Sequence, residues 1–243
     1  MKHPADRSMR ELTRRQLAYS WSLASNGAVD LKGQSFRGAP VLDLTNNNGI
    51  TRAAGPSAEL PDAAALASAS TQFFSRAFDP ALDPNPAVAA GIAQPFAISS
   101  WAYPAADGAF YGLANSRSAG NKWTLQRPNT NIFSMNVWDG GGTIRTANHA
   151  LTTTAATWYF VVAGWDGARV FVEVNSAGRV FADCVGVNLA QNTLIIGGNT
   201  AVPANPWNGR LAQFNMWVGR IPTRKEINWL YNGGQGRNIS GKP

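Results

Sequence analysis

Acidic side chains are the first candidates for catalysis, because a glycosidase needs two carboxyl groups close together. In a retaining enzyme one carboxylate attacks the sugar and the other exchanges a proton. The chain has four Glu residues that are far apart in sequence: Glu11, Glu59, Glu173 and Glu226. Glu173 has no acidic residue within five positions on either side. We therefore predict that the chain is not an enzyme, and we assign no catalytic residue.

Other residue types that carry catalysis or bind phosphate are sparse. The chain has two histidines, His3 near its start and His149 in a stretch that resembles a loop. We interpret His149 as a surface residue. The Gly140–Gly142 run lacks the lysine and the strand-to-helix context of a phosphate loop, so we interpret it as a turn. Cys184 is the only cysteine, which excludes an intrachain disulfide, and its strand-like context predicts a buried thiol.

Exposed aromatic side chains offer a flat apolar surface on which a sugar ring can stack, as in lectin sites. Most of the nine Trp residues are expected in the core, because an aromatic residue in an alternating strand usually packs inside. Trp207 belongs to a Trp-Asn-Gly-Arg turn and is interpreted as structural. The carbohydrate-binding candidates lie at expected strand ends or loops and are Tyr111, Trp123 and Trp138.

The net charge of +7 comes from 21 basic and 14 acidic residues. No run of five basic residues occurs, so nucleic-acid binding is not expected. The densest basic stretch is residues 1–15, within a separate N-terminal piece of residues 1–18 in which Ser8 and Glu11 have the spacing of a helix capping box. We predict a basic arm there, either a short helix or a frayed tail. The arm residues assigned to contact with a negatively charged protein are Arg7, Arg10, Arg14 and Arg15.

No apolar stretch approaches the ~18 residues of a membrane span. The polar N-terminus also lacks the apolar core of a secretory signal peptide. We therefore expect no membrane partner, and we expect synthesis in the cytoplasm, with export only as part of a particle.

The clearest structural element is a hairpin, in which residues 158–165 and 168–175 flank Asp166-Gly167. Its second half alternates with period two, so one face is predicted to be buried and the other wet. The buried set is Val170, Val172 and Val174, and the wet set is Arg169, Glu173 and Asn175.

Comparable runs predict further strands over 19–23, 41–45, 72–77, 96–103, 110–114, 123–127, 132–138, 179–181, 193–198 and 210–217. Residues 53–70 are predicted to be loop with a short helical turn, and residues 79–95 a long loop. One helix is predicted near the C-terminus, from the capping box Thr223–Glu226 to Asn232-Gly233-Gly234. A charged fraction of only 14% and 24 glycines fit an all-β chain of many short strands.

The motifs and their order resemble a known family. They are Leu44–Gly49, Phe96–Trp101, Thr157–Gly167, Val174-Asn175, Ile196–Gly198, Trp207–Leu211 and Leu230–Gly234. The set resembles a concanavalin-A-like domain of the laminin-G/pentraxin type over residues 19–237. The resemblance implies an all-β, two-sheet antiparallel jelly-roll sandwich with one concave face. The short C-terminal helix, the basic N-terminal arm (1–18) and a C-terminal tail (238–243) complete the expected organisation.

Domains of this type often bind Ca²⁺ at a loop edge through Asp and Asn side chains and backbone carbonyls. The resemblance therefore implies three metal-ligand candidates, Asp139, Asn47 and Asn199. Asp166 is excluded because the hairpin turn already explains it. No clustered carboxylates occur, so the ligands would have to converge from separate loops. No cofactor is assigned, and Ca²⁺ is the one candidate.

Stand-alone domains of this kind resemble proteins of tailed bacteriophages. The resemblance implies a non-enzymatic virion protein, such as a capsid decoration, head-fibre or tail-associated protein. Its expected partners are the major capsid protein or another virion protein, and a second copy of the chain. The alternative is a carbohydrate-binding module at a cell surface, with or without a calcium requirement, whose partner is a glycan.

Overall fold

The computed structural model describes residues 19–21, 23, 44–77, 93–117, 121–185, 187, 193–198, 205–237 and 239. The predicted basic arm with its four arginines and the calcium candidate Asn199 lie outside the described residues.

The described strands belong to two antiparallel sheets. One contains β1 (Tyr19–Trp21), β3 (Thr51–Ala54), β4 (Asp62–Leu66), β6 (Phe96–Pro104), β11 (Tyr159–Trp165), β12 (Arg169–Val174), β13 (Arg179–Asp183) and β15 (Gly209–Val218). The other contains β2 (Thr45–Asn47), β5 (Phe73–Ala77), β7 (Tyr111–Arg117), β8 (Asn121–Arg127), β9 (Ser134–Trp138), β10 (Ile144–Asn148) and β14 (Thr193–Ile196). The described helices are α2 (Arg224–Tyr231) and two short 3₁₀ helices, η1 (Ser68–Ser70) and η2 (Asn232–Gly234).

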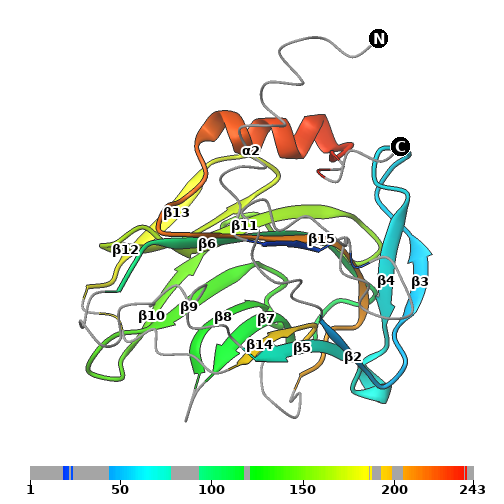
Figure 1. The fold of residues 1–243 in the computed structure, drawn as a ribbon, viewed down its shortest axis with the longest axis horizontal. Coiled ribbons are helices and arrows are strands. Elements are labelled where there is room, and N and C mark those ends of the chain that lie inside the picture. The colour runs from blue at the N-terminus through cyan, green and yellow to red at the C-terminus, as the bar shows by residue number, and fades with distance from the viewer. Residues whose placement is uncertain are drawn as a thin grey trace.

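The two sheets pack face to face, and α2 lies across the outer face of one of them (Figure 1). In the eight-stranded sheet the order is β13-β12-β11-β6-β15-β4-β3, with β1 also paired to β15. In the seven-stranded sheet the order is β10-β9-β8-β7-β14-β5-β2. The predicted two-sheet antiparallel sandwich with a short C-terminal helix is therefore confirmed.

The predicted hairpin is the β11–β12 pair. Asp166 Oδ1 accepts hydrogen bonds from the backbone amides of Ala168 and Arg169, at 2.9 and 2.7 Å, and so fixes the turn. As predicted, Val170, Val172 and Val174 are buried in the core between the sheets.

The prediction of a wet second face on this hairpin is confirmed for Arg169, which is exposed, but it was wrong for Glu173, and Asn175 is half-buried. Phe171 and Glu173 point to that face, and both are 0% exposed. The helix α2 covers the face with Ile227 and Leu230, which join Phe171 in a second apolar cluster. The centre of the eight-stranded sheet is therefore packed on both of its faces. Many antiparallel sheets instead expose one face to water.

Two segments predicted to be loops contain strands, although the short helical turn predicted within residues 53–70 is present as η1. Residues 53–70 contain most of the β3–β4 hairpin, in which Thr51 pairs with Ala65 and Ala54 with Asp62. Alanine has a low β propensity, so neither strand resembles one in isolation. The stretch before His149 is β10, an edge strand paired with β9.

The C-terminal helix begins and ends where the sequence predicts. The Thr223 side chain accepts from the Glu226 amide, and the Glu226 side chain accepts from the Thr223 amide, which completes the capping box. Asn232 ends the helix in the left-handed conformation, with φ 49°. No helix among the described residues is both long and apolar enough to cross a membrane.

Candidate functional site

Two neighbouring strands at the edge of the seven-stranded sheet present an uncharged surface, which we call the β9–β10 face. Met135 and Val137 of β9 are fully buried in the core, so the residues between them point outward. The outward side chains of both strands form the face: Ser134, Asn136, Trp138, Ile144, Thr146 and Asn148.

Hydroxyl and amide side chains pair across these strands. Ser134 Oγ donates to Asn148 Oδ1 at 2.7 Å, and Thr146 Oγ1 donates to Asn136 Oδ1 at 2.8 Å. Because each amide oxygen accepts from a hydroxyl, each amide NH₂ group is left as a donor. Neither NH₂ group donates to any residue that the structure describes.

The polar row continues into the centre of the same sheet. Asn136 pairs in register with Thr124 of β8, which pairs with Asn115 of β7. Thr124 Oγ1 and both polar side-chain atoms of Asn115 are buried without a hydrogen-bond partner. Buried polar groups in this state are costly and uncommon. Because Thr124 and Asn115 are buried, the donors that a ligand could reach are those of Asn136 and Asn148.

Among the three aromatic candidates, only Trp138 has a side chain that is partly exposed at the protein surface. It is half-buried and pairs in register with Ile144, which is 50% exposed. Trp123 is 0% exposed, because it lies in the middle of β8 on the core side and packs against Phe96. The prediction that Trp123 lies at an exposed strand end was therefore wrong.

Tyr111 is also in the core. It is 6% exposed, and its ring packs edge-on against Trp207 with centroids 5.9 Å apart. Trp207 itself is fully buried, in agreement with its predicted structural role. Neither ring presents a face on which a sugar could stack.

The calcium candidate Asp139 serves the β9–β10 turn. Its Oδ1 accepts from the backbone amides of Gly141 and Thr143, at 3.0 and 2.8 Å, and its Oδ2 accepts from Arg145 Nε at 3.1 Å. The hydrogen bond from Thr143, and then those from Arg145 and Gly141, outweigh burial and lower the pKa of Asp139. Both carboxylate oxygens are thus already occupied by donors.

The second calcium candidate, Asn47, lies on β2 at the opposite edge of the seven-stranded sheet. Five strand intervals, about 24 Å at ~4.8 Å each, separate β2 from β9 beside Asp139. Asn47 Nδ2 donates to the backbone oxygen of Phe73 and to Ser75 Oγ, at 3.2 and 3.0 Å. Within the described residues, no three His, Cys, Asp or Glu side chains lie together. The candidates that the structure describes do not fit a Ca²⁺ site.

His149 is buried, so its interpretation as a surface residue was wrong. It is 7% exposed, and its Nδ1 accepts from the Leu151 amide at 3.1 Å. Burial lowers its pKa, while a hydrogen bond to the Gly178 backbone and the Glu173 charge act in the opposite direction.

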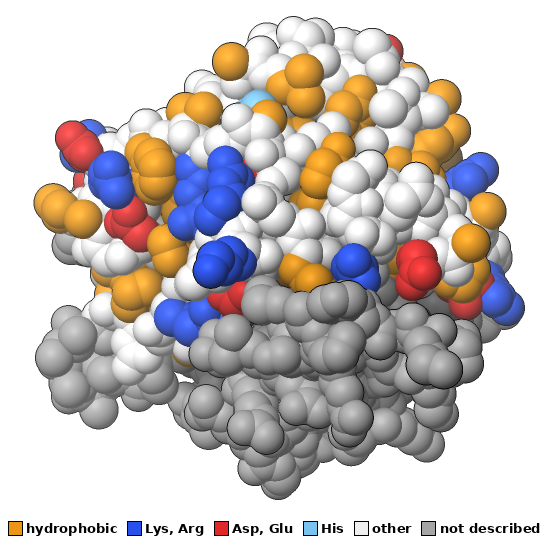
Figure 2. Space-filling model, turned by 90° about the horizontal axis from the view of Figure 1, so that it is seen from above, with side chains coloured by type: hydrophobic (Ala, Val, Ile, Leu, Met, Phe, Trp, Pro, Cys, Tyr) orange, Lys and Arg blue, Asp and Glu red, His pale blue; other side chains and the backbone are white. Residues whose placement is uncertain are grey.

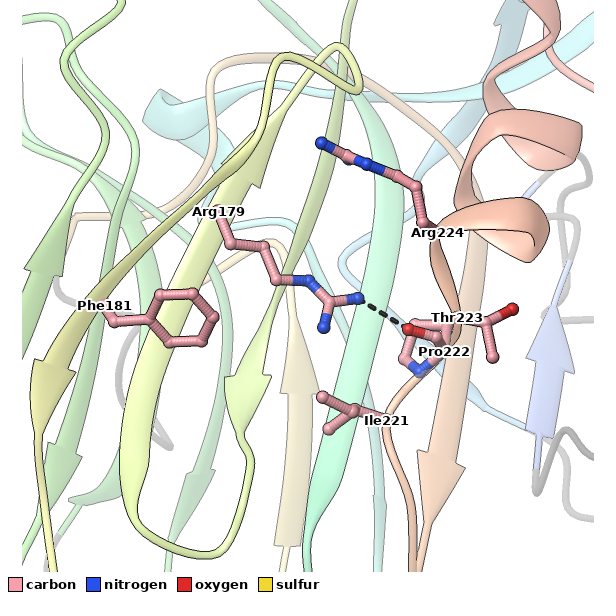
Figure 3. A pocket seen from close by; sticks show the side chains of 6 residues that line it. All are labelled: Arg179, Phe181, Ile221, Pro222, Thr223 and Arg224. Atoms are coloured by element: carbon pink, nitrogen blue, oxygen red, sulfur yellow. Dashed lines mark hydrogen bonds between the residues drawn. The ribbon is translucent and has the colours of Figure 1, made fainter.

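A pocket lies on the other sheet, between β13 and the start of α2, with a volume of about 430 Å³ (Figure 3). We call it the arginine pocket. Its lining residues are Arg179, Phe181, Ile221, Pro222, Thr223 and Arg224. Sequence analysis missed it because β13 and α2 are distant in the chain. The one available signal was Glu173, which lies directly opposite Arg179 across the β12–β13 pair.

The sequence matches the model of the Concanavalin A-like lectin/glucanases superfamily over residues 81–228, which is more than half of the chain. The chain therefore belongs to this superfamily. No curated protein matches its sequence.

Several solved structures share the fold. The binding domain of Paraclostridial Mosquitocidal Protein 1 superposes with a TM-score of 0.66 at 16% identity, covering 90% of this chain and 52% of that one. The botulinum neurotoxin serotype D binding domain gives 0.61 at 12% identity, covering 90% and 52%. Domain 4 of AbnA, a GH43 extracellular arabinanase from Geobacillus stearothermophilus in complex with arabinotriose, gives 0.50 at 15% identity, covering 87% and 96%. The chain thus spans about half the length of the toxin domains, and these identities support likeness of fold alone.

Proposed function

We propose that the chain is a carbohydrate-binding module that holds an uncharged glycan on the β9–β10 face. The observation that carries the proposal is the pair of amide groups on Asn136 and Asn148, whose NH₂ donors make no hydrogen bond to a described residue and lie on the same face as Trp138. Sugar hydroxyls accept from such donors, and the apolar face of a sugar ring packs on an indole. Asp139 and Arg145, the charged residues at the adjoining turn, pair with each other.

The structural relatives favour this function among those that the fold supports. The arabinanase domain was solved with arabinotriose bound. Cell entry of botulinum neurotoxin type C, whose structure gives a TM-score of 0.59 at 12% identity, depends on interaction with two ganglioside molecules. These are properties of those proteins, and for this chain they support glycan binding as a proposal.

A glycan array followed by titration with the best neutral ligand tests the function. Trp138→Ala is expected to weaken binding about tenfold, since aromatic packing contributes ~1 kcal/mol beyond area burial. Trp158→Ala is the matched control, because Trp158 is also half-buried but packs on Tyr103 of the other sheet. A chelator is expected to have no effect. Absence of any saturable glycan, or equal affinity in Trp138→Ala and wild type, contradicts the proposal.

Attachment to a virion stays a prediction, since the arm expected to mediate it lies outside the described residues. Glycan binding is compatible with it, because a virion protein can carry a glycan-binding face. Co-sedimentation with undecorated capsids tests it directly.

We also propose that the chain has no hydrolytic activity. Glu173 and Glu226 are buried on the α2 side and bind arginines. Assay of a polysaccharide panel for released sugar tests this proposal, and any hydrolysis contradicts it.

A further inference from the structure

We propose that the arginine pocket is a second binding site and that its ligand is an acidic sugar, a ring that bears one carboxylate. The pocket lies on the outer side of the eight-stranded sheet and shares no residue with the β9–β10 face. The inference therefore goes beyond the proposed function and does not depend on it.

The charge of the pocket suits one anionic group. Glu173 is 0% exposed and lies between two arginines: its Oε2 accepts from Arg179 Nε at 3.3 Å, and its Oε1 pairs with Arg224 Nη1. Two guanidinium groups and one carboxylate leave a net charge of +1. Basic side chains gather on this face of the molecule (Figure 2). One bound carboxylate would neutralise the excess.

Donors that match a carboxylate remain free in the pocket. Arg179 Nη1 and Arg224 Nη2 donate to no residue that the structure describes. Figure 3 shows the Arg179 guanidinium between Phe181 and Pro222, with Arg224 reaching over it from the start of α2. A guanidinium group presents planar, paired donors whose geometry fits a carboxylate.

Arg179 is held in place before any ligand arrives. Its Nη2 donates to the Pro222 carbonyl at 2.6 Å, and its guanidinium lies 4.7 Å from the Phe171 ring centroid. Its side chain is only 17% exposed. Preorganisation of this kind reduces the conformational entropy that is lost on binding.

The rest of the lining suits the ring of the ligand. The Phe181 side chain is 38% exposed although the Arg169 guanidinium lies 4.1 Å from its ring centroid, and Ile221 and Pro222 face it across the pocket (Figure 3). The volume of about 430 Å³ is within the range of small-molecule sites. A small inorganic anion would leave the apolar side unused, and a dianion would exceed the available positive charge. The pocket therefore fits a carboxylate attached to a compact ring.

Calorimetric titration of the full chain with glucuronic acid tests the inference, with glucose as the matched ring that lacks a carboxylate. Saturable binding of glucuronate without binding of glucose is expected. Acetate and inorganic phosphate are expected to bind at least about tenfold more weakly, since they make the charged contacts but not the ring contacts. Lack of saturable glucuronate binding, equal binding of glucose, or equal binding of acetate or phosphate overturns the proposal.

Two variants test the residues. Arg224→Gln and Phe181→Thr are each expected to weaken glucuronate binding about tenfold, the usual effect of losing a charge-assisted hydrogen bond or an aromatic contact. In Arg224→Gln, Glu173 keeps Arg179 as its partner, and Phe181 is partly exposed, so both variants are expected to fold. Arg52→Gln is the control, because Arg52 is 63% exposed and pairs with Asp62 outside the pocket.

A purely structural role for the arginines gives a different result. In that case Arg224→Gln lowers the unfolding temperature, whereas glucuronate affinity is unchanged in both variants, and the proposal fails. Trp138→Ala separates the two sites, since it is expected to leave glucuronate affinity unchanged while it weakens neutral glycan binding. Loss of glucuronate binding in Trp138→Ala would place the acidic sugar on the β9–β10 face and overturn the assignment.

Discussion

Cys184 follows β13 with a side chain that is 1% exposed, as its strand-like context predicted. Burial raises the pKa of its thiol to about 11. Because the thiolate is the reactive species, we expect the native protein to react very slowly with a thiol reagent at neutral pH. Unfolding in denaturant should restore the rate of an ordinary thiol. Stopped-flow absorbance with a disulfide reagent measures both rates, and fast stoichiometric labelling of the folded chain would contradict the prediction.

His149 makes stability depend on pH near neutrality. Burial lowers its pKa in the folded state below the ordinary 6.5, so the unfolded chain binds more protons as the pH falls through that value. The stabilisation is complete above pH 6.5 and decreases below it, toward the folded pKa. His149→Gln should remove this part of the slope. Urea unfolding of both proteins at several pH values measures it, and parallel pH profiles would show that His149 does not contribute.

At the scale of elements, Arg127 holds two loops against the end of β8. It is 0% exposed; its Nε donates to Thr153 Oγ1 at 2.8 Å, its Nη1 donates to the Ala106 carbonyl at 3.1 Å, and it pairs with Asp107. Lysine cannot reproduce this fork of donors, so Arg127→Lys should lower the free energy of unfolding by ~2–3 kcal/mol. Arg52→Lys, at an exposed ion pair, should change it by less than ~1 kcal/mol. Chemical denaturation compares the two variants, and equal effects would contradict the assigned role.

The sequence predicts the elements that are specified by neighbouring residues. It does not predict those whose pairing or burial depends on residues far away in the chain. The β11–β12 hairpin is predictable because Asp166-Gly167 and the alternating valines lie within one short segment. The β3–β4 hairpin is not, because its alanines have little strand preference and β4 is held in the sheet by its pairing with β15. The burial of Glu173 depends on α2, and its partner Arg224 is 51 positions away in the chain.

The same distinction applies to the candidate sites. Trp123 and Trp138 are both aromatic residues of short strands, and composition does not separate them. Their exposure depends on register: Trp123 pairs with the core residue Val137, one position before Trp138. A shift of one residue in β pairing moves a side chain to the other face of the sheet. The sequence therefore predicted the class of residue, and only the paired strands identify which aromatic reaches the surface.

At the scale of the whole molecule, the eight-stranded sheet connects two apolar clusters. One lies between the sheets, and the other lies between this sheet and α2. Alternate residues of the same strands enter each cluster, as Phe171 and Val172 of β12 do. The two candidate sites lie on the outer sides of the two sheets, so ligands at both would be separated by the full thickness of the sandwich.

This shared sheet predicts that the described body unfolds as one cooperative unit. Leu230 of α2 is 0% exposed in the outer cluster, so Leu230→Ala should cost ~2–5 kcal/mol of stability. Lys225→Ala, at an exposed position of the same helix, should cost less than ~0.5 kcal/mol.

Tryptophan fluorescence samples both clusters, through Trp101 and Trp217 in the outer cluster and Trp123 in the cluster between the sheets. Far-ultraviolet circular dichroism samples the strands. In Leu230→Ala both transitions should move to lower denaturant together. Separate transitions, with fluorescence changing first, would show that α2 detaches from a sandwich that remains folded without it.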